Sequence, residues 1–318
     1  MDSDKYVWIP RDLGFTKDIA VALLARFGCP YKPLFSDEPA GDEIRAQVEV
    51  LIAKEHTVNK ATLEPWPNAR LVSCAFTGID GVDQAMCRDR GTAVYFVPDY
   101  SKTAVAELAV GLTIAVLRKL VQADKDARAG CWDRAVAPGI ELHGKTVGIV
   151  GTGLIGCESA KRFVAFGCRI LGWSRTAREA FVAAGGQYVN DIQALLREAD
   201  VVVLHLPASA ETHRYIDAAK FAAMKPSAVL INVARAAIVD TTALVEALRK
   251  HRIAGAGIDV FDTEPLTSTV HPLQSLGNAV LCPHIGFKTD VSLNRLREAA
   301  IENIGRFTRG DAKNRLIP

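Results

Sequence analysis

Short apolar runs alternate with segments of helical periodicity along the first part of the chain. Runs of about four to eight residues bounded by turn residues predict buried β-strands. Four of them lie at residues 6–9, 48–52, 71–75 and 94–97. Since helical patterns separate these runs, the region from residue 6 to residue 98 is predicted to be a small α/β unit with a parallel sheet.

A second series of the same kind begins after Gly144-Lys145. Repeated βα units of this length predict an open, doubly wound sheet, whose ligands bind at the carboxyl ends of the strands. The predicted helices are 154–166, 191–199, 217–224 and 241–250, and the predicted strands are 146–150, 169–173, 201–204, 229–232, 255–259 and 279–281.

The stretch 103–122 between the two series is mostly apolar and has a helical pattern. A helix that is apolar on nearly every side must be covered by other protein. We therefore predict one long helix here, buried between domains or between subunits.

Length and charge narrow the range of functions. A chain of 318 residues is expected to form two domains. Its 38 basic and 36 acidic residues are mixed along the chain, which gives no indication of binding to nucleic acid or to an acidic membrane surface. Residues 1–5 lack the features of a secretory signal, and the apolar stretch 108–117 is too short to cross a bilayer, so a cytoplasmic location is expected.

The seven cysteines are scattered and include no C-x-x-C pair, so they are expected to be reduced and mostly buried. No grouping of cysteine, histidine and carboxylate residues has the spacing of metal ligands. We therefore predict no metal.

Gly151, Gly153 and Gly156 fit the pattern G-x-G-x-x-G between a predicted strand and a predicted helix. In this context the first glycine forms a tight turn, the second lets the backbone approach a pyrophosphate, and the third lets the helix pack on the strand. The N-terminus of the helix adds N–H donors and a positive dipole. The segment predicts a dinucleotide site.

The next predicted strand ends in Ser174, Arg175 and Thr176, where such units usually have an acidic residue for the ribose 2′-hydroxyl. A guanidinium matches a phosphate with two parallel hydrogen bonds, and Arg178 lies nearby. NADP(H) is therefore favoured over NAD(H), which stays possible. In the alternative, Arg175 is a solvated surface residue and Ser174 alone contacts the ribose.

Three polar residues follow later strands on the side where the cofactor is expected. They are Arg235, Glu264 and His284. Each alone also has a structural explanation, as a salt-bridged surface group, a loop carboxylate before a proline and a core histidine, respectively.

Together the segments in this order resemble the D-isomer-specific 2-hydroxyacid dehydrogenase family over nearly the whole chain. The matching segments are 76–83, 105–108, 151–156, 205–207, 232–240, 257–265 and 283–286. The resemblance implies two doubly wound parallel-sheet domains of the α/β class. These are a flavodoxin-like substrate-binding domain at 1–99, completed by 287–318, and a Rossmann dinucleotide-binding domain at 100–286.

The family resemblance implies catalytic roles that reduction of a 2-keto acid requires. Arg235 would bind the carboxylate and carbonyl of the substrate, and its planar guanidinium suits a 2-oxo acid. His284 would donate a proton to the new hydroxyl group. Glu264 would hydrogen-bond His284, orient the ring and stabilise its charged form.

Further contacts are implied by the same resemblance, each with local packing or turn formation as the alternative. Asp259 is expected near the nicotinamide carboxamide, and the backbone of Phe76, Thr77 and Gly78 is expected to bind the substrate carboxylate. Arg235 and His284 would contact both substrate and cofactor. The remaining expected cofactor contacts are Thr103, Leu154, Ile155, His205, Leu206, Pro207, Thr212, Val233, Ala234 and Gly286.

The sequence departs from the family pattern at a few positions. Ala236 replaces a glycine that usually follows the arginine, which is expected to affect rate or substrate range. Thr77 occupies a position where a phosphite-oxidising member would carry lysine, which weakens the assignment of phosphite as substrate. The Glu264/His284 pair differs from the glutamine/histidine pair of formate dehydrogenases, which argues against formate. Lys54 could bind a second anionic group of the substrate, with a solvated lysine as the alternative.

We therefore predict an NAD(P)-dependent D-2-hydroxyacid dehydrogenase that reduces a small 2-keto acid similar to glyoxylate or hydroxypyruvate. Two alternatives stay open. One is an oxidative dehydrogenase of another small oxyanion such as phosphite, and the other is a dinucleotide-sensing binding protein like the co-repressors of the family. A homodimer is expected, with the helix 103–122 and Trp132 at its interface.

Overall fold

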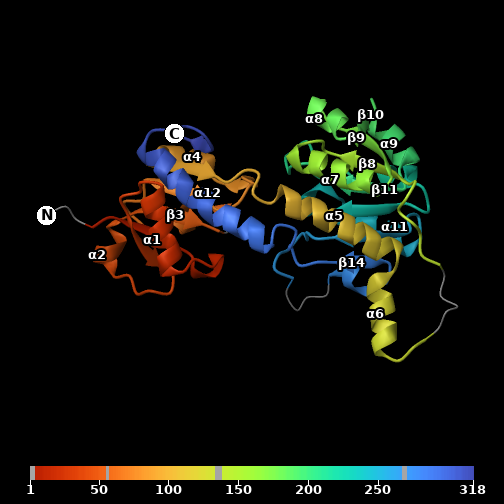
Figure 1. Ribbon diagram of the computed structural model, residues 1–318, viewed down its shortest axis with the longest axis horizontal. Coiled ribbons are helices and arrows are strands. Elements are labelled where there is room, and N and C mark those ends of the chain that lie inside the picture. The colour runs from red at the N-terminus through yellow and green to blue at the C-terminus, as the bar shows by residue number, and fades with distance from the viewer. Residues whose placement is uncertain (1–3, 55–56, 133–137, 267–270) are drawn as a thin grey trace. The chain divides into compact units, whose positions relative to one another are not determined.

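The computed structural model describes residues 4–54, 57–132, 138–266 and 271–318. The chain forms two compact units (Figure 1). Unit 1 comprises Met1–Ser101 and Thr289–Pro318, and unit 2 comprises Lys102–Lys288. Both units are α/β, as the sequence predicts.

Unit 1 is built on a six-stranded sheet in the order β15-β7-β5-β3-β1-β2. Counted along the chain, its five parallel strands lie in the order 2-1-3-4-5, which is the flavodoxin-like arrangement. This confirms the predicted fold class. The strands are β1 (Tyr6–Ile9), β2 (Lys32–Phe35), β3 (Val48–Ala53), β5 (Leu71–Cys74), β7 (Ala93–Phe96) and β15 (Arg315–Ile317), with β4 (Thr57–Val58) and β6 (Gly81–Val82) paired in a small separate sheet.

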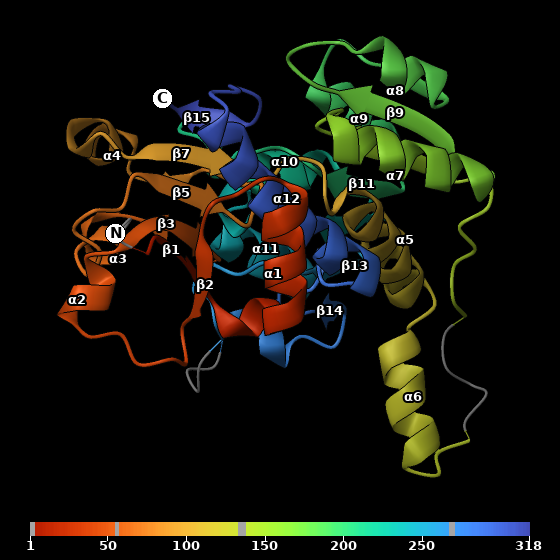
Figure 2. The same cartoon turned by 60° about the vertical axis from the view of Figure 1, so that its left-hand side comes forward.

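The parallel strands of unit 1 are apolar because helices cover both faces of the sheet. Helices α1 (Lys17–Arg26) and α12 (Asp290–Thr308) pack together on one face (Figure 2). Buried residues of α3 (Lys60–Leu63) and α4 (Gln84–Arg90) join the core on the other face, near α2 (Asp42–Arg45). A short 3-10 helix, η1 (Arg11–Leu13), follows β1.

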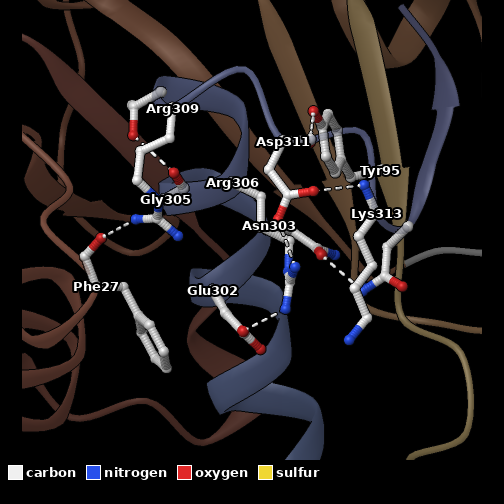
Figure 3. A network of polar contacts seen from close by, with 11 residues as sticks. Phe27, Tyr95, Glu302, Asn303, Gly305, Arg306, Arg309, Asp311 and Lys313 are labelled. Atoms are coloured by element: carbon white, nitrogen blue, oxygen red, sulfur yellow. Dashed lines mark hydrogen bonds and ion pairs between the residues drawn. The ribbon is translucent and has the colours of Figure 1, made fainter.

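The C-terminal end of α12 is tied into unit 1 by polar contacts (Figure 3). Arg306, whose side chain is 12% exposed, forms ion pairs with Glu302 and Asp311. The Tyr95 hydroxyl donates to the Asp311 carbonyl at 2.7 Å, and the Asn303 amide donates to the Phe96 carbonyl at 3.0 Å. These contacts hold the last strand, β15, antiparallel against β7. The antiparallel edge is a departure from the all-parallel prediction.

Unit 2 contains a seven-stranded parallel sheet in the order β10-β9-β8-β11-β12-β13-β14. The order reverses between β8 and β11, which is the switch point of a Rossmann fold where dinucleotides bind. The strands are β8 (Thr146–Val150), β9 (Arg169–Trp173), β10 (Gly186–Tyr188), β11 (Val201–Leu204), β12 (Val229–Asn232), β13 (Gly255–Ile258) and β14 (Ala279–Leu281).

Alternate residues of these strands enter two separate apolar cores, one on each face of the sheet. Val201 and Val203 of β11 pack with α5, α7 and α8, while Val202 and Leu204 pack with α9, α10 and α11. The helices are α5 (Lys102–Leu117), α7 (Leu154–Ala165), α8 (Glu179–Ala183), α9 (Ile192–Glu198), α10 (Ala218–Ala223) and α11 (Thr241–Arg249), with 3-10 helices η2 (Ala236–Ile238) and η3 (Pro272–Ser275).

The prediction of one helix over 103–122 is wrong. Helix α5 ends at Leu117, and α6 (Leu120–Arg128) begins after Lys119, whose φ of +52° is left-handed (Figure 1). Residues of α5 are extensively buried, whereas α6 buries none. The apolar pattern that requires burial ends where the chain turns, so the remaining segment is free to leave the core.

The prediction also missed short elements at the sheet edges. Strands β2, β10 and β15 are only three or four residues long and contain few apolar residues, so they give no clear periodicity.

All seven cysteines are free, and five of them are buried. Among the described residues, none of the helices is both long enough and apolar enough to cross a membrane.

Candidate active site

The glycine turn lies at the switch point of unit 2, between β8 and α7. Gly151 has a φ of +102°, and a Cβ there would lie 2.7 Å from the His205 carbonyl carbon. A Cβ at Gly156 would lie 2.2 Å from the Gly151 oxygen, so the helix packs directly on the turn. By contrast, a Cβ at Gly153 would have no atom of the described residues within 4 Å. The turn is therefore tight on its protein side and open at Gly153.

The first turn of α7 fits a dinucleotide pyrophosphate. Gly153 is the N-cap of this helix and provides no side chain to accept from the backbone N–H groups. A helix N-terminus without a side-chain cap presents donors and a positive dipole to an anion. Leu154, the first helical residue, is 53% exposed, and Ile155 is partly buried.

His205 follows β11, beside the glycine turn. Its Nε2 lies 2.8 Å from the Ser159 hydroxyl of α7, and its Nδ1 is buried without a hydrogen-bond partner among the described residues. Burial lowers the pKa of His205 to about 3, so the ring is neutral. The side chain therefore links β11 to α7 within the protein, and its backbone is the part that lies against the glycine turn.

The loop after His205 is stabilised by its own hydrogen bonds. The Thr212 hydroxyl donates to the Pro207 carbonyl at 2.7 Å and accepts from the Ser209 N–H at 2.8 Å. Leu206 is partly buried and packs against the core. Thr212 thus shapes the loop that the sequence analysis places at the cofactor.

Arg175 lies in the exposed segment after β9, with Thr176 exposed and Ser174 partly buried. Its guanidinium forms an ion pair with Glu211, which lies in the loop after β11. Both side chains are largely exposed, at 74% and 69%. The ion pair joins residues 36 positions apart, and sequence patterns gave no indication of Glu211.

Arg235 lies just after β12, at the carboxyl edge of the sheet. The Asn232 side chain accepts from the Ala234 N–H at 3.1 Å and donates to the Arg235 carbonyl at 3.0 Å. This bridge fixes the backbone that carries the arginine. The guanidinium also donates to the Ala234 carbonyl at 2.9 Å, and Ala236 begins the 3-10 helix η2.

Asp259 follows β13 and is 1% exposed. Its carboxylate accepts from the backbone N–H groups of Ile285 and Gly286, each at 2.9 Å. Burial raises the pKa of Asp259, and these two hydrogen bonds oppose the rise. The carboxylate is therefore used at least in part to hold the segment around His284.

His284 has a left-handed backbone with a φ of +53°. Such a conformation is strained in a residue other than glycine and persists only where its surroundings hold it. Its own N–H donates to the Asp259 carbonyl at 2.9 Å, and the Asp259 carboxylate binds the next two N–H groups. Three backbone hydrogen bonds to Asp259 thus position the His284 ring.

Glu264 contacts the His284 ring directly. Its Oε2 lies 2.6 Å from His284 Nδ1, while its Oε1 accepts from the Phe261 N–H at 2.8 Å. The two side chains are partly buried, at 24% exposure for His284 and 33% for Glu264. A carboxylate against one ring nitrogen selects the tautomer and favours proton transfer at the other nitrogen, Nε2.

The structure places every predicted catalytic and cofactor residue in unit 2. They follow the carboxyl ends of β8, β9, β11, β12, β13 and β14, apart from Thr103 at the start of α5. Val233 is buried and Ala234 partly buried, both just after β12. Parallel strands bring these segments to one edge of the sheet.

The predicted substrate loop lies in unit 1, after β5. Phe76 is 1% exposed and packs in the core. The Thr77 hydroxyl donates to the Val97 carbonyl at 2.8 Å, and the Phe76 carbonyl accepts from the Val97 N–H at 3.1 Å. These bonds fix the loop, and Gly78 follows partly exposed. The role of the loop in binding substrate stays a prediction.

Lys54 follows β3 in unit 1 and forms an ion pair with Asp12. Asp12 belongs to η1, after β1, and was not singled out by the sequence. A neighbouring carboxylate neutralises much of the ammonium charge. Binding of a second substrate anion by Lys54 stays a prediction, and such an anion would have to compete with Asp12.

Comparisons with known proteins agree with this geometry. The family described as "D-isomer specific 2-hydroxyacid dehydrogenase, NAD binding domain" matches residues 110–286. The chain is 37% identical to a glyoxylate reductase of Thermofilum pendens over 279 residues, which cover 86% of this chain and 82% of the relative. The chain belongs to the D-isomer-specific 2-hydroxyacid dehydrogenase family.

Solved structures show the same likeness over the whole chain. The glyoxylate reductase from Paecilomyes thermophila superposes with a TM-score of 0.84 at 26% identity and 99% coverage of both chains. The NADPH-dependent glyoxylate/hydroxypyruvate reductase from Sinorhizobium meliloti, solved with NADP and malonate, gives a TM-score of 0.80 at 30% identity and covers 96% of this chain and 94% of that one.

Membership in this family identifies the class of activity. The protein is an oxidoreductase that transfers a hydride between a nicotinamide dinucleotide and a small 2-keto or 2-hydroxy acid. The matched NAD-binding region contains the glycine turn.

Among the described residues, no group of three or more His, Cys, Asp or Glu residues could hold a metal ion.

Proposed function

We propose that this enzyme reduces glyoxylate, hydroxypyruvate or a similarly small 2-keto acid, with NADPH as its preferred cofactor. The observation that carries the proposal is the 2.6 Å contact between Glu264 Oε2 and His284 Nδ1, on a backbone held by Asp259. This arrangement is suited to moving one proton at a fixed point.

The chemistry then divides among three side chains. When bound, the reduced nicotinamide supplies a hydride to the carbonyl carbon. His284 donates a proton from Nε2 to the carbonyl oxygen, which becomes the hydroxyl group. Glu264 stabilises the protonated ring before the transfer. Arg235 binds the substrate carboxylate and polarises the carbonyl through its planar guanidinium.

The proposed substrates follow from the relatives and from the charge of the site. The similar curated and solved proteins include glyoxylate reductases and a glyoxylate/hydroxypyruvate reductase. The Lys54 ammonium already forms an ion pair with Asp12, so a second anionic group on the substrate would have to compete for it. We therefore assign a substrate with one carboxylate and a small, neutral remainder.

The preference for NADPH is supported by the segment after β9. Arg175 is exposed there, and residues 174–176 contain no carboxylate. A guanidinium can bind a 2′-phosphate with two parallel hydrogen bonds. The similar enzyme from Sinorhizobium meliloti is described as NADPH-dependent.

We further propose a homodimer formed through α6 and the groove beside it. Leu120 and Val121 of α6 are 48% and 44% exposed, and Trp132 is 80% exposed. A groove of about 540 Å³ lies between the α5–α6 region and the segment 273–281. Light scattering on a sizing column should give twice the monomer mass, and Val121→Asp should shift the protein towards the monomer. A wild-type protein that elutes only as a monomer would exclude this assembly.

Activity is tested by mixing the purified protein with NADPH or NADH and one of four acids: glyoxylate, hydroxypyruvate, pyruvate and phenylpyruvate. Absorbance of the reduced nicotinamide reports turnover. We expect the highest kcat/KM with glyoxylate or hydroxypyruvate and NADPH. No turnover with any acid would reject the reductase, and a preference for phenylpyruvate would reject the small-substrate assignment.

A further inference from the structure

A carboxylate approaches the ribose end of the dinucleotide site from an unexpected loop. Sequence patterns place the usual acidic residue at the end of the second strand, and this chain has Ser174, Arg175 and Thr176 there. In the structure, Glu211 of the loop after β11 forms an ion pair with Arg175. The ribose end therefore contains both a guanidinium and a carboxylate.

The topology of unit 2 places this pair across the glycine turn. Strands β9 and β11 are the two neighbours of β8, and the turn follows β8 directly. The segment after β9 carries Arg175, and the segment after β11 carries Glu211. A dinucleotide on the glycine turn extends its adenosine ribose towards the end of β9. The ion pair thus lies where the ribose 2′ substituent is expected.

Two further contacts fix the loop that carries Glu211. Tyr215 of this loop stacks on Trp173, the last residue of β9, with ring centroids 5.3 Å apart and planes inclined by 19°. The Thr212 hydroxyl closes the loop on the Pro207 carbonyl. The carboxylate is therefore held near Arg175 by the loop's own structure, beyond the attraction between the two charges.

The ion pair is exposed and hence weak enough to exchange. Exposed pairs contribute about 0 to 1 kcal/mol, because water and salt screen them and ordering two long side chains costs entropy. A 2′-phosphate can replace Glu211 as the partner of Arg175, but it then lies beside a carboxylate of the same sign. A 2′-hydroxyl can instead donate a hydrogen bond to that carboxylate.

We propose that Glu211 determines how strongly the enzyme discriminates between NADPH and NADH. Arg175 attracts the 2′-phosphate of NADPH, and Glu211 opposes it while accepting a hydrogen bond from the 2′-hydroxyl of NADH. This inference rests on the proposed function in that both cofactors bind at the glycine turn. The inference goes beyond the proposed function by naming Glu211 as the residue that limits the preference for NADPH over NADH.

The test measures cofactor binding without turnover. Titration calorimetry at low ionic strength gives the Kd of NADPH, NADH, adenosine 2′,5′-bisphosphate and ADP for each protein. Glu211→Gln keeps the size of the side chain and removes its charge. We expect it to tighten binding of NADPH and of the bisphosphate about fivefold, and to leave binding of NADH and ADP unchanged or about twofold weaker.

Two further variants isolate the cause. Arg175→Gln should remove most of the effect of Glu211→Gln on NADPH, because the phosphate then lacks its partner. Glu198→Gln is the control, since Glu198 forms a half-exposed ion pair with Arg169 at the opposite end of β9. It should change none of the four affinities.

The outcomes separate this inference from the proposed function. Equal changes for NADPH and NADH in Glu211→Gln would overturn the role of Glu211, whereas the same selective gain for NADPH without Arg175 would support Glu211 acting by direct repulsion of the phosphate. Failure of the wild-type protein to bind either cofactor would instead reject the dinucleotide site itself. A wild-type preference for NADH would reject the proposed NADPH preference, whereas a selective gain for NADPH in Glu211→Gln would still support Glu211.

Discussion

The two ends of the proposed dinucleotide site are built on opposite principles. At the catalytic end, the buried Asp259 binds three consecutive backbone N–H groups and holds His284 in a strained conformation. At the end where the ribose is proposed to bind, Arg175 and Glu211 are largely exposed and form a surface ion pair. Proton transfer requires a fixed geometry, while discrimination between two cofactors needs only a balance of charges that ligands can shift.

The glycine turn lies between these ends and combines both features. Its protein side is packed against His205, while at Gly153 no atom of the described residues lies near the position of a Cβ. Rigid packing and open space therefore occur within a few residues. Four substitutions test this contrast, from the largest expected effect to the smallest.

His284→Asn tests the catalytic end. The variant loses the proton donor, so kcat should fall about a thousandfold, while the Kd for NADPH should change less than about threefold. Stopped-flow turnover and calorimetric titration measure the two quantities. Retention of more than a tenth of the wild-type kcat would show that another group supplies the proton.

Asp259→Asn tests whether the buried carboxylate holds the catalytic segment. An amide can place its NH₂ group against one of the backbone N–H donors, which leaves a buried donor without an acceptor. We expect the free energy of unfolding to fall by about 2 to 3 kcal/mol and kcat to fall as well. Urea unfolding is the measurement, and Asp262→Asn, at an exposed carboxylate nearby, is the control. Equal stability losses in both variants would contradict the role of Asp259.

His205 makes stability depend on pH. Its pKa is about 3 in the folded protein and about 6.5 in the unfolded chain, so the unfolded state binds an extra proton as the pH falls between these values. This group should therefore lower the free energy of unfolding by about 2 kcal/mol between pH 7.5 and pH 5. His205→Asn should remove that part of the pH dependence.

The control for this measurement is His213→Asn, at an exposed histidine of the same loop. It should leave the pH dependence close to that of the wild type. If His205→Asn and the wild type lose stability in parallel as the pH falls, the buried neutral ring is not the cause.

Gly153→Ala tests the open side of the glycine turn. Its φ of −70° suits alanine and a Cβ meets nothing, so the midpoint of thermal unfolding should stay within about 2 °C. The methyl group should nevertheless obstruct the pyrophosphate and weaken NADPH binding about tenfold, which is about 1.4 kcal/mol. Gly41→Ala, at another N-cap glycine with open space around a Cβ, serves as control. Unchanged affinity in Gly153→Ala would mean that the pyrophosphate does not approach this residue.

Much of the architecture could be predicted because it depends on local patterns. The strands of unit 2 are mostly apolar, and the predicted boundaries of β8, β9, β11, β12 and β14 agree with the structure. Residues directly after parallel strands must meet at one edge of the sheet, so Arg235 and His284 could be assigned to a common region. Segments with weak periodicity, such as β2 and β15, gave no such signal.

Other features depend on contacts between distant segments. The helix break at Lys119 lies within a continuous helical pattern, and the segment between α12 and the antiparallel β15 is held on β7 by contacts such as Tyr95 with Asp311. Ion pairs of Arg175 with Glu211 and of Lys54 with Asp12 join different loops. Sequence spacing contains no information about such pairs until the strand order is known.

The sequence by itself determined the fold class, the glycine turn and the types of side chain at the strand ends, because periodicity and chain connectivity are local properties. Only the tertiary structure decided what those side chains contact. It turned the His205 ring into the protein, directed Asp259 to the backbone around His284, and brought Glu211 to Arg175. These contacts arise from packing between elements far apart in the chain, where burial and charge select one partner among many.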